Sequence, residues 1–236
     1  IGGFMAVYSL RYPLYGQVFV AFTGIPAALA LNEISLSQKK KRQFTEIMKI
    51  IRYSLFENKQ LCYNIMFSGL IGAATLTMAW LIQPILIYLQ TPTEYFGVIW
   101  TVLNLTVGVS ALYSDKIDRL FGMKKTYAFI LFLIVGGYVV LAYNLTYIGM
   151  IVLFVFYICR GFATPILKGY INQIAFSNMR ATVLSIRNFI IRLIFAAMAP
   201  FVGWLSDSYS LQSALLVSAV IIFIPGLFFF VLQVRK

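Results

Sequence analysis

Residues 114–143 read SDKIDRLFGMKKTYAFILFLIVGGYVVLAY, and this stretch decides the fold. Its first twelve positions hold six charges, whereas residues 127–143 hold none and are apolar all round. A strand of a membrane barrel would instead alternate polar and apolar positions. The apolar run therefore predicts a membrane-spanning α-helix, and the charged segment before it predicts the end of that span.

The rest of the chain repeats this pattern. Hydrophobic residues make up 61% of the 236 positions and charged residues 11%, which is the composition of a membrane protein. A helix crosses a hydrocarbon core about 30 Å thick with about 20 residues. We therefore expect an all-α membrane protein embedded in a lipid bilayer, with seven spans near residues 14–31, 61–89, 94–113, 126–143, 147–167, 183–205 and 211–232.

The net charge of +12 comes from basic residues that gather in alternate connections. Lys and Arg are frequent in residues 33–60, 114–125 and 168–187 and at the C-terminus, and the connections between these carry none. Because basic loops stay in the cytoplasm, we expect a multi-pass protein of the inner membrane with a cytoplasmic C-terminus. A nucleic-acid-binding protein would gather its basic residues on one soluble face, so no nucleic-acid partner is expected.

The long connection at residues 33–60 divides the chain into two parts. Within it, Phe44, Ile47, Met48, Ile51 and Leu55 recur at helical spacing, with polar residues on the other sides. This pattern predicts an amphipathic helix on the cytoplasmic surface of the membrane, and a solvated linker is the alternative. The predicted organisation is the end of one helical bundle at residues 1–32, this linker, and a second bundle of six helices at residues 61–236.

The charged segment resembles the loop motif of the major facilitator superfamily of transporters. That motif has a small residue four positions before an Asp-Arg pair, followed by Gly and two basic residues, and the segment departs from it by a Ser in place of Gly and one extra residue before the later Gly. The resemblance implies a gating loop that consists of Ser114, Asp115, Asp118, Arg119, Gly122, Lys124 and Lys125. In the family, the Asp and Arg form a charge network that breaks and reforms as the two halves rock. A solvated turn that satisfies the sorting of positive charge is the alternative.

Residues 160–211 are similar to the tenth and eleventh helices of bacterial multidrug-efflux facilitators, with RATVLS at the entry and Pro200, Gly203 and Asp207 at the exit. The resemblance implies that residues 1–32 are the end of the fifth and all of the sixth helix, and residues 61–236 the seventh to twelfth. The missing N-terminal helices of the same protein would then be a partner of this bundle. The chain opens with IGGFMAVYSLRYP and lacks an initiator Met, so we expect it to begin inside a span.

The family builds each half from two inverted three-helix repeats. A trace of this repeat is visible where ALYSD ends at Asp115 and GWLSD ends at Asp207, at positions expected on opposite sides of the membrane.

Polar residues inside spans are costly in lipid and tend to face a cavity, so they mark a candidate transport path. The candidates are Arg160, Thr164, Tyr157, Arg192, Asn188, Asn64, Ser68 and Asn104. Arg160 is the most informative, and snorkelling or a bond to backbone carbonyls is the alternative for it. Packing between helices is the alternative for Asn64, Ser68 and Asn104. No Asp or Glu lies deep within a span, so the counter-charge for Arg160 would come from the missing helices or from the substrate.

Catalysis has little support in the sequence. There is no Walker-type phosphate loop and no His, and Cys62 and Cys159 are far apart, so we expect no enzyme activity, no cofactor and no metal site. The favoured function is a secondary transporter that moves a small-molecule substrate by alternating access, with proton-coupled efflux as the direction that the resemblance implies. Uptake of a small anionic solute is one alternative, and a non-transporting receptor or scaffold is the other.

Overall fold

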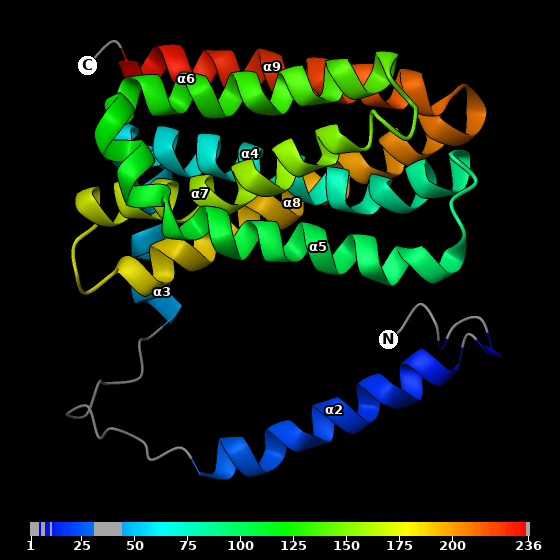
Figure 1. Ribbon diagram of the computed structural model, residues 1–236. Helices are drawn as coiled ribbons and strands as arrows, with labels where there is room; N and C mark the ends of the chain where they lie inside the picture. The colour runs from blue at the N-terminus through cyan, green and yellow to red at the C-terminus, as the bar shows by residue number, and fades with distance from the viewer. Residues whose placement is uncertain (1–4, 6–7, 10, 31–43, 235–236) are drawn as a thin grey trace.

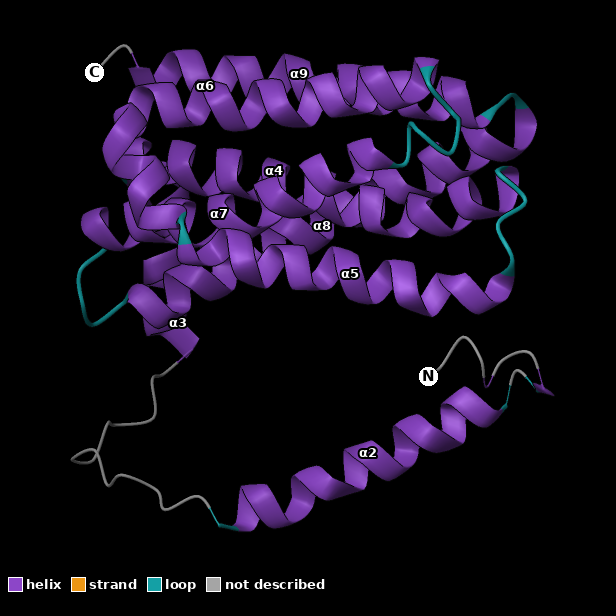
Figure 2. Cartoon of the chain, viewed as in Figure 1, coloured by secondary structure: helices purple, strands orange, loops and turns teal. Residues whose placement is uncertain are grey.

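The computed structural model describes residues 5, 8, 9, 11–30 and 44–234, and these residues form helices and no strands (Figure 2). Within this described part of the chain, six helices are long and apolar enough to cross a membrane. They are α4 (Lys59–Tyr88), α5 (Thr93–Leu112), α6 (Ser114–Tyr143), α7 (Ile151–Ile174), α8 (Arg180–Ser208) and α9 (Leu211–Val234). Large apolar side chains such as Phe132, Phe189 and Ile224 are exposed on the outside of this bundle. An exposed apolar surface of this extent suits lipid rather than water, so the fold is that of an all-α, multi-pass membrane protein.

The six helices form two triplets, α4–α6 and α7–α9, whose members make equivalent contacts. Helix α4 packs against α8 and α9, and α7 packs in the same way against α5 and α6. Helices α4 and α7 contact each other, as do α6 and α9, which lie side by side in Figure 1. Replacing α4, α5 and α6 by α7, α8 and α9 therefore reproduces the main contacts, which is the arrangement that two three-helix repeats produce.

Small residues allow the closest of these contacts. A Cβ atom on Gly161 of α7 would lie 2.5 Å from the carbonyl oxygen of Val107 on α5. A Cβ atom on Gly69 of α4 would lie 2.6 Å from the side chain of Ile190 on α8. Gly69 and Gly161 are separated by the same 92 residues as the two Asp positions of the sequence repeat. Each triplet thus uses a glycine at the same position of the repeat for a close contact between helices.

The two ends of the bundle differ in charge. The end formed by the N-termini of α4, α6 and α8 and the C-termini of α5 and α7 is called the basic end here. Its cations lie near the helix ends and are Lys59, Lys116, Arg119, Lys124, Lys125 and Arg180. The connections at the opposite, neutral end span residues 89–92, 144–150 and 209–210 and contain no Lys or Arg. The alternating charge of the sequence is therefore a segregation of charge between the two ends.

Two boundaries differ most from the sequence prediction. The segment 114–125, predicted as a loop, is helical and belongs to α6, with a break at Gly122, whose φ of 68° and ψ of 163° are not helical. Helix α7 continues to Ile174, seven residues past the predicted end at residue 167, because Lys168 is accommodated within the helix. Pro165 also lies inside α7 without ending it.

The predicted first span is a helix, α2 (Tyr12–Leu29), but it is not among the six helices apolar enough to cross a membrane. The polar and weakly hydrophobic residues of its first turns lower its mean hydropathy. Figure 1 shows α2 apart from the bundle, and nearly all of its described side chains are exposed.

The amphipathic helix of the linker is present as α3 (Phe44–Arg52), which continues into a π-helical turn at Tyr53–Glu57. Its inner side packs at the basic end, where Ile50, Ile51 and Leu55 contact a buried cluster that includes Leu61. Phe44 and Met48 remain exposed on the other side. The remainder of the linker prediction, residues 33–43, lies outside the described residues.

Candidate functional site

A polar cavity of about 380 Å³ lies between α4, α7 and α8. Its lining residues are Gly72, Thr75, Leu76, Arg160, Thr164, Lys168, Arg187, Asn188, Ile191 and Arg192. Four of the eight predicted path residues, Arg160, Thr164, Asn188 and Arg192, are thus brought together on one wall or the other. Arg160 and Thr164 belong to α7, and Asn188 and Arg192 belong to α8. The structure therefore places predicted residues of two helices on opposite walls of one cavity.

The cavity carries four cations. Lys168 and Arg160 project from α7, and Arg187 and Arg192 project from α8. None of the described residues that line the cavity is Asp or Glu. Arg187 is buried, Arg160 and Lys168 are half-buried, and Arg192 is exposed. Without a carboxylate among the described lining residues, these cations give the cavity a positive potential.

The cations lie at two depths. Counted along the helices from the basic end, Lys168 and Arg187 lie about 10 Å in, and Arg160 and Arg192 lie about 20 Å in. Arg160 is also about 14 Å from the start of α7, so it lies close to the middle of its helix. Positive side chains therefore follow each other along α7 and α8, from near the basic end to about the middle of the two helices.

Arg187 was missed by the sequence prediction. Its side chain is 4% exposed, and it donates hydrogen bonds from Nε to the hydroxyl of Ser68 and, over 3.1 Å, from Nη1 to Oδ1 of Asn188. The available signal was that Arg187 is a charged residue within the predicted span at residues 183–205. Arg187 holds Ser68 and Asn188 in a single polar network.

The other predicted path residues do not line the cavity. Ser68 is buried behind it, bonded to Arg187. Asn64 is buried among side chains and accepts a hydrogen bond from the hydroxyl of Tyr127. The packing alternative therefore describes Asn64, since its partner lies on a neighbouring helix.

Tyr157 and Asn104 are also placed elsewhere. Tyr157 is buried, and its ring lies 6.4 Å from that of Trp100 on α5. Asn104 is exposed on α5 and donates within its own helix to the carbonyl of Trp100 over 2.8 Å. Helical spacing grouped Tyr157 with Arg160, but the ring of Tyr157 lies against α5 instead. Asn104 was a candidate only as a polar residue inside a span.

The segment that was predicted as the gating loop contacts α7 through a hydrogen bond. Asp118 accepts a hydrogen bond from the hydroxyl of Tyr170, and Arg119 donates from Nε to the carbonyl of Asp115 over 3.2 Å. Ser114 is buried, whereas Lys124 and Lys125 are exposed at the basic end. The Asp of the motif is therefore held by a tyrosine at the basic end of α7, the helix that also carries Arg160.

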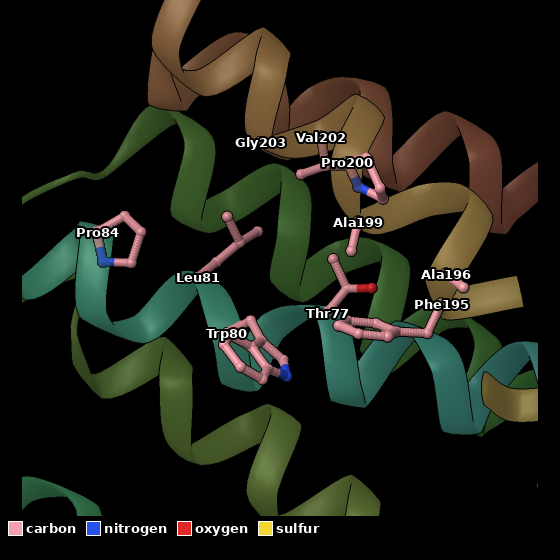
Figure 3. Close-up of a pocket in the computed structure, with 10 residues that line it drawn as sticks. All are labelled: Thr77, Trp80, Leu81, Pro84, Phe195, Ala196, Ala199, Pro200, Val202 and Gly203. Atoms are coloured by element: carbon pink, nitrogen blue, oxygen red, sulfur yellow. The ribbon is translucent and has the colours of Figure 1, made fainter. Parts of the chain in front are cut away.

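A second cavity of about 510 Å³ lies between α4 and α8 nearer the neutral end (Figure 3). Trp80 of α4 and Phe195 of α8 border it, with ring centroids 6.2 Å apart. Thr77 supplies the one side-chain oxygen among its lining residues, and that hydroxyl faces the sulfur of Met198 at 3.9 Å. This cavity is apolar where the first is cationic.

No protein-family model matches the chain, and no curated protein matches it with significance.

Proposed function

We propose that this protein is a secondary transporter of the major-facilitator type, which moves a small molecule across the membrane by alternating access. The observation that carries the proposal is the cationic cavity between α4, α7 and α8. Charged side chains at mid-membrane depth are costly and are kept where they serve a substrate or ion pathway. The equivalent packing of the triplets α4–α6 and α7–α9 also supports a transporter, because transporters of this class place their sites at the interface of such repeats.

The membrane in which the protein lies, its orientation there and the direction of transport are also parts of this proposal. The segregation of basic residues to one end supports a protein of the inner membrane with the basic end in the cytoplasm. Proton-coupled efflux is the direction that the family resemblance favours, with protons as the coupling ion. Uptake of an anionic solute is the second candidate, and the four cations of the cavity favour it.

Alternating access can be tested by the labelling of a cysteine in the cavity. In a full-length protein that lacks Cys62 and Cys159, Thr164→Cys would be treated with a membrane-impermeant maleimide from either side. The proposal predicts labelling from the basic end and from the neutral end in turn, with the ratio shifted by an imposed proton gradient. Ala163→Cys is the matched control, because Ala163 is 1% exposed and is expected to stay unlabelled.

A receptor or scaffold would give a different result. The cysteine at position 164 would then be labelled from one side alone, at a rate that the gradient leaves unchanged. That outcome would overturn the alternating-access proposal while leaving the fold intact.

A further inference from the structure

The two cavities follow each other along the same pair of helices. On α4, the cationic cavity ends at Leu76 and the apolar cavity begins at Thr77. On α8, Arg192 is the last residue of the first and Phe195 is the first residue of the second, about 5 Å further along the axis. The groove between α4 and α8 thus changes from cationic to apolar within one helical turn.

Helices α7 and α5 border parts of this groove. The cationic cavity is closed on one side by α7. Trp80, which borders the apolar cavity, also lines a small hollow with Gln83 and with Trp100 of α5. A single elongated molecule that lies along the groove between α4 and α8 can therefore contact the linings of both cavities.

We propose that the substrate class of this transporter is an amphiphilic anion, and this rests on the transport function proposed above. Its acidic group lies between Arg160 and Arg192, and its apolar body extends past Trp80 and Phe195 toward the neutral end. Charge complementarity selects the head, because the cavity offers four cations and no carboxylate among its described lining residues. The apolar walls select the body, since burial of a hydrocarbon contributes about 0.8 kcal/mol per CH₂ group.

The sizes of the cavities suit such a molecule. At about 380 and 510 Å³, each lies within the roughly 300–1,000 Å³ range of small-molecule sites. An inorganic anion would fill a small part of the first cavity and none of the second. A hydrophobic cation would meet four like charges at the entry to the apolar part. The combined groove therefore fits an anion with a hydrocarbon or aromatic body better than either.

The test is direct binding of dodecanoate to the purified full-length protein in phosphatidylcholine nanodiscs. Dodecanol, which is neutral, and dodecyltrimethylammonium, which is cationic, are the comparison ligands. We expect dodecanoate to bind at least tenfold more tightly than either. Arg192→Gln should lower dodecanoate affinity at least tenfold and leave dodecanol unchanged. Lys116→Gln, which removes an exposed cation outside the cavity, should leave both unchanged.

Two results would overturn the proposal. Equal binding of the three ligands, or equal loss in both variants, would mean that charge in the cavity does not select the head group. Displacement of dodecanoate by phosphatidylglycerol placed in the nanodisc, with the same dependence on Arg192, would identify a resident membrane lipid instead of a substrate.

Measurement of dodecanoate flux distinguishes a wrong substrate class from a wrong transport function. If dodecanoate binds through Arg192 but does not move in proteoliposomes, the binding site stands and transport fails. If another class of compound moves while dodecanoate does not bind, transport stands and the substrate class is wrong.

Discussion

The contact between α5 and α7 at Gly161 can be tested by adding one methyl group. In Gly161→Ala, the new Cβ would lie 1.8 Å from the hydroxyl oxygen of Ser110 and 2.5 Å from the carbonyl oxygen of Val107, where ordinary contact begins at 3.4 Å. Ser110 can rotate away, but it then leaves its hydrogen bonds to the carbonyls of Thr106 and Val107, at 2.7 and 3.1 Å. The carbonyl of Val107 belongs to the backbone, so α5 itself has to move.

The expected cost follows from these contacts. Overpacking costs about 1–3 kcal/mol, and an unsatisfied buried hydroxyl adds about 1 kcal/mol. Ala is favoured over Gly in a helix by about 1 kcal/mol, so the net destabilisation is about 1–3 kcal/mol. For a chain of this length, that lowers the midpoint of thermal unfolding by about 2–12 °C.

Thermal unfolding of the purified protein in detergent measures this shift. Gly169→Ala is the matched control on the same helix, because a Cβ there would meet nothing within 4 Å. The control should unfold at the wild-type temperature or slightly above. If Gly161→Ala is as stable as Gly169→Ala, α5 and α7 do not approach as closely as the structure places them.

Three further substitutions test other contacts. Tyr138→Phe removes a buried hydrogen bond of 2.8 Å to the carbonyl of Ala74, and should lower the free energy of unfolding by about 1 kcal/mol in the same thermal assay. Gly122→Ala places a side chain at a φ of 68° and should cost about 1–3 kcal/mol, read from the same unfolding midpoint; an unchanged midpoint would mean that the helix does not break there. Tyr170→Phe removes the donor to Asp118, and should speed hydrogen exchange of backbone amides in residues 114–121 without changing exchange in the rest of α6.

The spans were predictable because length and apolarity alone define them. The predicted and observed bounds of α4, α5 and α9 differ by two residues or fewer. The end of α7 was not predictable in this way. Lys168 resembles the charge that ends a span, but its side chain faces the cationic cavity and the helix continues.

The site was predictable in part for a related reason. Arg160 and Arg192 stand out because their charge is unusual within an apolar span. Arg187 was hidden, because seven residues after Arg180 it reads as part of a basic helix end, and its burial depends on Ser68 from another helix. Asn64 shows the opposite error, since a polar side chain can be satisfied in packing as well as in a cavity. Tyr157 was misplaced because its ring is buried against Trp100 of α5.

Flux through proteoliposomes of the full-length protein tests the central claim most directly. Wild type, Arg160→Ala and Lys116→Ala would be compared for dodecanoate and a panel of small molecules, with and without a proton gradient. The account predicts gradient-dependent movement in the wild type and in Lys116→Ala, and its loss in Arg160→Ala while folding and insertion persist. Equal movement in Arg160→Ala, or no movement of any compound in the wild type, would contradict a transport path through the cationic cavity.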